Sequence, residues 1–221
     1  MSEVFIVAAS RTAVGSLGKS LKNISAEDLG SSVISDVLKR SKIESNDVDE
    51  VIMGQVLTGS TGQNPARQAA IQAGLPIDKT AYVINQVCGS GLRSVAAGYQ
   101  TIMSNDANII VAGGQESMSN APHAINIREG QKLEESRLID TMIKDGLWDA
   151  FNGYHMGVTA ENVAAKWKIT REDQDSFALS SQLKAEKAQK EGKFENEIIP
   201  VIRKGENKLK IDEHLRAGMT L

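Results

Sequence analysis

The sequence contains few cysteine, proline and aromatic residues. Its 221 residues include one cysteine, four prolines and only 4% aromatic side chains. A single cysteine excludes an intrachain disulfide framework, which favours a reducing compartment. No apolar run is long enough to span a bilayer, and residues 1–3 lead into an apolar segment without the basic region of a secretory signal. These absences predict a cytoplasmic protein without a membrane partner.

Neither sign of charge predominates. The 25 basic and 28 acidic residues give a formal net charge of −3 at pH 7. This balance gives no electrostatic reason to expect nucleic acid or an anionic membrane surface as a partner. The 41% hydrophobic and 24% charged residues are ordinary for a globular protein, and the length allows one large domain or two smaller ones.

The one cysteine lies between a strand-like run and a glycine-rich turn. Residues 82–87 precede Cys88, and Gly89-Ser90-Gly91 leads into residues 95–103, whose apolar positions fit a helical period. The pattern places Cys88 at a strand-to-helix corner, where backbone N–H groups and the helix dipole favour a nucleophilic thiolate. Cys88 is therefore a candidate nucleophile, although a single intracellular cysteine is more often a buried, inert residue.

Short apolar runs alternate with helical patterns through the first half of the chain. The expected strands are residues 4–9, 49–57, 82–87 and 107–112, and the expected helices are 26–40, 66–73 and 95–103. Such alternation predicts an α/β fold with a parallel sheet that is covered on both faces. Ser25 with Asp28, and Asn64 with Pro65, are residue types typical of helix starts.

The pattern changes after residue 117. We expect residues 1–117 to form one layered core domain and residues 118–221 a second region, an insertion or loop domain that stops before it is complete. Helices are predicted for residues 159–167 and from Thr170, which forms a capping box with Asp173, to about Gly192. Residues 197–202 read as an edge strand, because Pro200 cannot donate to a sheet.

Several motifs, taken in order, resemble those of the thiolases. Residues 87–94 resemble the nucleophile motif of that family, and residues 11–18, 62–69, 112–119, 145–151 and 154–162 match further family segments. The pattern is most similar to the biosynthetic, short-chain group. The resemblance implies a layered αβαβα fold and an acetyl-CoA C-acetyltransferase activity, which forms or cleaves acetoacetyl-CoA through an S-acetyl-cysteine.

The resemblance also assigns site residues. It implies that Cys88 attacks an acyl-CoA thioester, that His155 and Met156 line the acyl and pantetheine pocket, that Leu147 packs along coenzyme A, and that Arg216 lies near its adenine and phosphate end. From the residues alone, His155 could instead be structural or the base that activates Cys88, Leu147 an ordinary core residue, and Arg216 an exposed arginine. The resemblance implies a homo-oligomer, a dimer or tetramer, with coenzyme A thioesters as substrates and with no other cofactor and no metal.

Thiolases have a second half whose motifs do not occur in these residues. That half supplies an Asn-Glu-Ala-Phe-like segment, a Gly-His-Pro segment with the activating base, and a Cys-x-Gly-Gly-Gly segment with a proton-transfer cysteine. The chain therefore reads as the amino-terminal portion of a thiolase, inactive in condensation. Two alternatives stay open: a non-catalytic thiolase-like oligomerisation or binding fragment, and a relative of the fatty-acid condensing enzymes, against which the loop at residues 154–157 argues.

Overall fold

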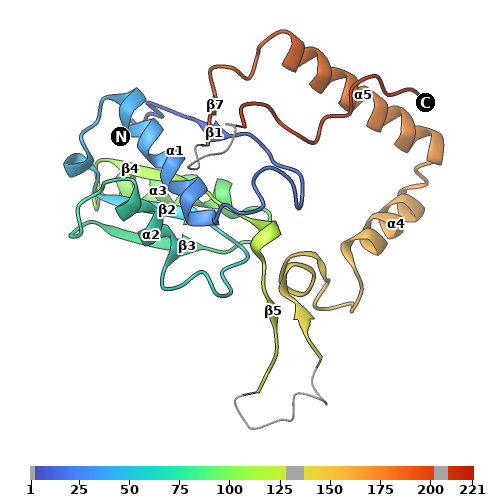
Figure 1. Ribbon diagram of the computed structural model, residues 1–221, viewed down its shortest axis with the longest axis horizontal. Helices are drawn as coiled ribbons and strands as arrows, with labels where there is room; N and C mark the ends of the chain where they lie inside the picture. The colour runs from blue at the N-terminus through green and yellow to red at the C-terminus, as the bar shows by residue number, and fades with distance from the viewer. Residues whose placement is uncertain (1–2, 128–136, 202–208) are drawn as a thin grey trace.

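A three-stranded parallel sheet lies at the centre of the layered part of the molecule (Figure 1). The structure, a computed structural model, describes residues 3–127, 137–201 and 209–221. The strands are β2 (Glu50–Gly54), β3 (Thr80–Ile84) and β4 (Ile110–Gly114), in the order β3-β2-β4. Gly54 pairs with Ile84 on one side and Gly114 on the other, so the three carboxyl ends lie level.

Helices α1 (Ala26–Ser41) and α2 (Pro65–Gln72) cover one face of this sheet. Val51 and Met53 of β2 join a buried cluster with Ile34 of α1 and with three alanines of α2, which are Ala66, Ala69 and Ala70. The small alanine side chains allow α2 to lie close to the strands. This cluster is the main hydrophobic core.

Helix α3 (Ser90–Met103) covers the opposite face. A Cβ atom added to its Gly98 would lie 3.2 Å from Ile110 Cγ2 and 3.7 Å from Ala112 Cβ, both on β4. In the register of the sheet, these residues are level with Glu50 and Ile52, and successive side chains along a strand point to opposite faces. The predicted parallel sheet with both faces covered is confirmed.

The outer side of α3 carries exposed apolar residues. Leu92, Val95 and Tyr99 are 77%, 38% and 53% exposed. Their spacing of three and four residues places them on one side of the helix. The outer side of the helix is therefore apolar and exposed, whereas its buried residues are small, two serines and a glycine.

The helix starts follow the predicted capping residues. Ser25 Oγ accepts a hydrogen bond from the Asp28 N–H at 3.2 Å, and Asn64 Oδ1 accepts from the Arg67 N–H at 3.1 Å. Helix α5 (Arg171–Lys190) begins with a complete capping box between Thr170 and Asp173. These local predictions are confirmed.

The apolar run at residues 4–9 does not form a strand, contrary to the prediction. The first strand, β1, is only Arg11–Thr12, which pairs in parallel with β7 (Ile198–Ile199). Phe5, Ile6 and Val7 are 72%, 81% and 68% exposed. An extended segment needs a neighbour for its backbone groups, and no residue that the structure describes pairs with this one.

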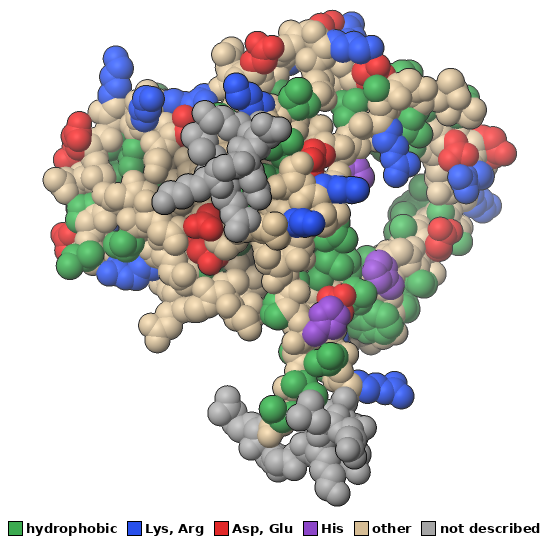
Figure 2. All heavy atoms as spheres, in the orientation of Figure 1, with side chains coloured by type: hydrophobic (Ala, Val, Ile, Leu, Met, Phe, Trp, Pro, Cys, Tyr) green, Lys and Arg blue, Asp and Glu red, His purple; other side chains and the backbone are tan. Residues whose placement is uncertain are grey.

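The second part of the chain extends away from the layers (Figure 1). Strands β5 (His123–Ala124) and β6 (Ile139–Asp140) pair in antiparallel fashion and are followed by the short helix η4 (Met142–Leu147). Helix α4 (Met156–Trp167) and α5 then form an arc, along which Figure 2 shows acidic and basic side chains mixed. Two short 3-10 helices complete the described elements, η1 (Ser45–Asp47) and η2 (Met118–Asn120). No helix within the described ranges is long and apolar enough to cross a membrane.

The carboxyl end of β2 lies directly against the first turn of α3. A Cβ atom added to Gly54 would lie 2.4 Å from the carbonyl carbon of Ser90 and 2.5 Å from the nitrogen of Gly91. Both are backbone atoms of α3, so they have little freedom to move aside. Glycine at position 54 is therefore what allows the helix to start at this point.

We predict that Gly54→Ala lowers the free energy of unfolding by about 3 kcal/mol, because the added methyl group overlaps backbone atoms. Gly113→Ala is the matched control on the neighbouring strand, since its Cβ would contact only the flexible Met53 side chain, at 3.8 Å. We expect a loss below about 1 kcal/mol there. Urea unfolding measures both variants, and equal losses would contradict the prediction.

Candidate functional site

Cys88 lies in the turn between β3 and α3, as the sequence predicts. Strand β3 ends at Ile84 and α3 begins at Ser90, and the thiol is free and exposed. Among the residues that the structure describes, the Cys88 side chain makes no hydrogen bond. The N-terminal end of the 14-residue helix α3 stabilises nearby negative charge. This location suits a thiolate nucleophile and the oxyanion that forms when a thiolate attacks a carbonyl group.

A buried amide pair lies at the same edge of the sheet. The side chains of Gln55 and Gln115, which follow β2 and β4, are 1% and 6% exposed. Gln115 Nε2 donates to Gln55 Oε1 at 2.9 Å and lies 3.2 Å from the Pro65 carbonyl oxygen. This pair joins the ends of two strands to the start of α2.

Glu116 organises the loop that follows β2. Its carboxylate accepts the Val56 N–H at 2.8 Å and the Leu57 N–H at 3.1 Å. Burial raises the pKa of Glu116, and the two backbone N–H groups oppose this rise. Sequence reasoning did not select Gln55, Gln115 or Glu116 as individual site residues. The available signal was polar residues directly after two apolar strands, where the carboxyl edge of a parallel sheet collects side chains.

Leu147, His155 and Met156 lie on one hairpin. Trp148 and His155 form an antiparallel bridge, and the Asp149 N–H donates to the Tyr154 carbonyl oxygen at 2.8 Å. The structure therefore brings Leu147, which ends η4, close to His155 and Met156, which begin α4. Leu147 is half-buried, whereas His155 and Met156 are exposed.

His155 also caps a helix. Its Nδ1 accepts the Gly157 N–H at 3.0 Å at the start of α4. An imidazole nitrogen that accepts a hydrogen bond carries no proton, so in the neutral ring the proton is on Nε2. His155 can therefore present an N–H donor while its other nitrogen holds the helix start.

Helix η4, which leads into this hairpin, lies against the loop that follows β2. A Cβ atom added to Gly146 would lie 3.8 Å from Cδ2 of Leu57, in the loop after β2. In the same loop, the Val56 carbonyl oxygen lies 3.5 Å from Nδ2 of Asn85, three residues before Cys88. Helix η4 and the segment that leads to Cys88 thus contact one loop, and His155 follows η4 along the chain. Within the described part of the chain, no hydrogen bond joins their side chains.

Arg216 lies on a different segment, which packs against α5. The backbone N–H of Arg216 donates to Gln182 Oε1 at 3.1 Å, and the backbone N–H of Gly218 donates to Glu186 Oε2 at 3.3 Å. The Arg216 residue is exposed. The structure therefore groups Leu147, His155 and Met156, but it does not bring Arg216 into that group by any described contact.

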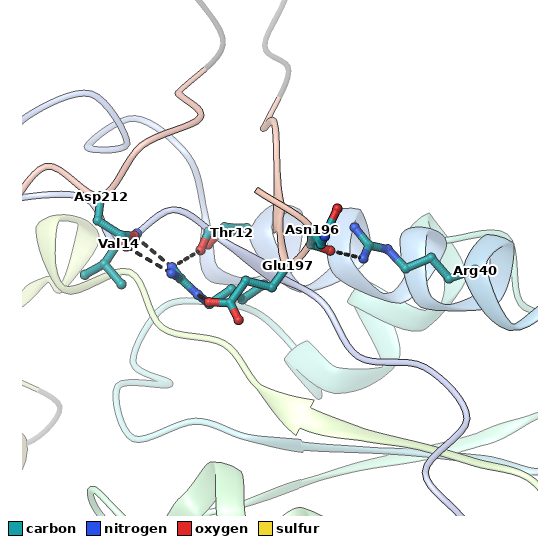
Figure 3. Close-up of polar contacts among 7 residues, drawn as sticks. Thr12, Val14, Arg40, Asn196, Glu197 and Asp212 are labelled. Carbon is teal, nitrogen blue, oxygen red and sulfur yellow. Dashed lines mark hydrogen bonds and ion pairs between the residues drawn. The ribbon is translucent and has the colours of Figure 1, made fainter. Parts of the chain in front are cut away.

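An ion-pair cluster fixes the segment that leads to Arg216 (Figure 3). The Arg11 guanidinium donates to both oxygens of Asp212, at 2.8 and 3.0 Å, and to Glu197 at 2.7 Å. It also lies over the Phe194 ring, 5.3 Å from the ring centre. Asp212 in turn accepts the Val14 N–H at 2.7 Å. These contacts join the first loop of the chain to its last segment.

Three further hydrogen bonds lie near this cluster. Glu213 accepts hydrogen bonds from the Ser16 N–H, at 2.9 Å, and from the Ser20 hydroxyl. Arg40 of α1 donates to the Asn196 carbonyl oxygen, as Figure 3 shows. Sequence reasoning did not find these pairs, since Arg11 and Asp212 are separated by 201 positions.

No metal centre is arranged within residues 3–127, 137–201 and 209–221, where no group of three or more His, Cys, Asp or Glu could hold an ion.

The chain is similar to proteins of one family along its length. The thiolase N-terminal domain matches residues 4–221. Acetyl-CoA acetyltransferases from Paracoccus denitrificans and Rhizobium meliloti are each 58% identical, covering 100% and 99% of this chain and 57% and 56% of the relative. The cytosolic acetyl-CoA acetyltransferase of Rattus norvegicus is 49% identical and covers 99% of this chain and 56% of the relative. The chain therefore spans a little over half the length of these relatives.

We predict that Asp212→Asn lowers the melting temperature at neutral pH by about 2–4 °C, because it removes the charged partner of Arg11. The Arg11 hydrogen bonds hold the pKa of Asp212 below its ordinary value of 3.8. A carboxyl group whose pKa is lowered in the fold stabilises it above the unfolded pKa, and that contribution disappears as the pH falls through the folded value. The difference between wild type and variant should therefore shrink only below about pH 4.

Asp78→Asn is the control for the charge change itself. Asp78 is exposed and makes no ion pair or side-chain hydrogen bond in the described part of the chain. Its replacement should change the melting temperature little across the same pH range. A difference for Asp212→Asn that persists undiminished in strong acid would contradict the role given to the ion pair.

Proposed function

Because this chain belongs to the thiolase family and has a thiolase-like α/β fold, we propose that Cys88 accepts an acetyl group from acetyl-CoA. This is the first step of acetyl-CoA C-acetyltransferase chemistry. The observation that carries the proposal is the position of the one cysteine, exposed at the N-terminal end of α3 and at the carboxyl edge of the sheet.

The step is an exchange of one thioester for another. The Cys88 thiolate attacks the carbonyl carbon of acetyl-CoA, and a tetrahedral oxyanion forms. The bond from this carbon to the coenzyme A sulfur then breaks, so that coenzyme A leaves as a thiolate and takes up the proton that Cys88 has lost. Sulfur is both a good nucleophile and a good leaving group, which makes the acetyl group transferable again.

The hairpin with Leu147, His155 and Met156 is proposed to contact the bound thioester. Support comes from the contact of the preceding helix η4 with the loop after β2 and from the His155 tautomer, which leaves an Nε2–H donor for a carbonyl oxygen of the substrate. Leu147 and Met156 would supply apolar contacts along the pantetheine chain. Arg216, exposed beside α5, is proposed to meet the phosphate end of coenzyme A, since a guanidinium suits phosphate oxygens.

Condensation requires a further step, in which a second acetyl-CoA loses a proton from its methyl group and attacks the acetylated cysteine. The sequence has one cysteine, which the first step occupies, and lacks the second-half motifs of the family. We therefore propose that these 221 residues alone form acetoacetyl-CoA slowly or not at all.

The organisation of the protein is proposed on the same basis. We infer a core domain of residues 1–117, a loop domain of residues 118–221, and a cytoplasmic homo-oligomer with acyl-CoA substrates. The rat relative is named as cytosolic, and the apolar outer side of α3 favours association with another chain or domain. A non-catalytic role in association is the second candidate function, and the same apolar side of α3 supports it.

Incubating the purified chain with acetyl-CoA should give one acetyl adduct, which intact-mass spectrometry detects and peptide mapping assigns to Cys88. Cys88→Ser should lose the adduct, because an unactivated hydroxyl is a far weaker nucleophile than a thiolate. His123→Ala, at an exposed histidine of β5 outside the proposed site, is the control and should keep it. Association of the chain without an acetyl adduct would favour the non-catalytic role. Formation of acetoacetyl-CoA at rates typical of enzymes would contradict the proposal that these residues alone carry out only the first step.

His155→Asn should slow acetylation about tenfold, the equivalent of one hydrogen bond, while leaving the chain as stable as the wild type. Asparagine is a good helix cap, so its side-chain oxygen can still accept the Gly157 N–H, but it cannot place a donor where Nε2 lies. The rate of adduct formation and the melting temperature are measured together, with His123→Asn as the matched control. An unchanged acetylation rate would limit His155 to capping α4.

A further inference from the structure

The residue before Cys88 is held in an unfavourable backbone conformation. Val87 has φ 48°, in the left-handed region, and it is the one β-branched residue with positive φ in the described ranges. Valine rarely adopts this conformation because its branched Cβ collides with the backbone. Such a conformation persists only where surrounding contacts hold it, and it occurs most often at functional sites.

The contacts that hold Val87 come from two side chains. Asn85 Oδ1 accepts the Val87 N–H at 2.9 Å. The Ser90 hydroxyl donates to the Val87 carbonyl oxygen at 2.6 Å and accepts the Gln86 N–H at 2.9 Å. The Ser90 N–H also donates to the Val87 carbonyl oxygen, at 3.1 Å. One hydroxyl group therefore binds both residues that precede the cysteine.

Ser90 itself has little freedom. Its side chain is only 4% exposed, and its backbone lies against Gly54 at the end of β2. The hydroxyl thus fixes the turn at residues 86–88 relative to the sheet and to α3. Without it, Val87 could return to an extended conformation, which would turn the Cys88 thiol away from the N-terminal end of α3.

We propose that Ser90 is a positioning residue whose hydroxyl keeps Val87 left-handed and thereby aims the Cys88 thiol for reaction. The proposal rests on the proposed function, in which Cys88 carries the acyl group. Ser90 acts through the backbone of Gln86 and Val87 and has no part in the bond exchange itself.

The alkylation rate of Cys88 by iodoacetamide, measured across pH on the full chain, tests this proposal. The reagent reports on one site because the sequence has one cysteine. In Ser90→Ala, we expect the rate at neutral pH to fall about tenfold, because the thiolate, which is the form that iodoacetamide alkylates, loses the helix end that stabilises negative charge.

Ser94→Ala is the matched control. Ser94 is also a serine of α3, 0% exposed, and its hydroxyl lies 2.7 Å from the Gly113 carbonyl oxygen, so its loss weakens the packing of α3 on β4 without touching the turn. It should lower the melting temperature but leave the alkylation profile unchanged. Equal profiles for the two serine variants, or a Ser90→Ala profile equal to the wild type, would overturn the proposal.

Val87→Gly in the Ser90→Ala background provides a rescue. Glycine adopts positive φ without steric cost, so the double variant should recover most of the lost alkylation rate. The double variant also keeps the test usable if Ser90→Ala alone folds poorly, because relief of the strain at residue 87 favours folding. A double variant that folds, but whose cysteine is alkylated as slowly as that of a free peptide of residues 82–94, would overturn the proposal.

The same proteins, incubated with acetyl-CoA, separate this inference from the proposed function. An acetylated wild type with no difference between the Ser90 and Ser94 variants rejects the positioning role alone. A wild type that is never acetylated, but whose alkylation depends on Ser90 as described, rejects the acyl-transfer function and leaves the positioning of the thiol intact.

Discussion

The contact between the end of β2 and the first turn of α3 determines the geometry of the candidate site. Gly54 has no side chain, so the backbone of Ser90 and Gly91 can lie directly on the strand. Gly91 in turn lies beside Gly114 of β4, where an added Cβ would be 3.8 Å from the Gly114 Cα. Since backbone atoms pack against backbone atoms here, the start of α3 has a fixed position relative to the sheet. The position of the turn with Cys88, which directly precedes α3, is fixed with it.

Features fixed by neighbouring residues could be predicted from the sequence. The starts of α1, α2 and α5 depend on Ser25, Asn64 and Thr170, whose side chains bond to backbone groups only three residues away. The corner at Cys88 was predictable for a similar reason. An extended run followed by glycines and a helical period leaves few ways for the chain to continue.

Features that need distant or unusual partners could not be predicted. Phe5, Ile6 and Val7 have strand-forming side chains, but a strand also requires a neighbour, which periodicity does not supply. Arg11 and Asp212 meet only after the whole chain has folded, because they come from opposite ends of it. Val87 would be expected in an extended conformation from its branched side chain, and only the hydrogen bonds of Asn85 and Ser90 explain its positive φ.

The hairpin of residues 147–156 and the turn that carries Cys88 are held in place by different contacts. The turn with the sulfur atom is held by the glycine contact at Gly54 and by hydrogen bonds from the side chains of Asn85 and Ser90 to backbone groups. The hairpin of residues 147–156 is held by its own Trp148–His155 bridge and follows η4, whose Gly146 lies against the loop after β2. If the hairpin contacts the thioester as proposed, its side chains could be replaced to admit a longer or branched acyl chain without moving the sulfur atom.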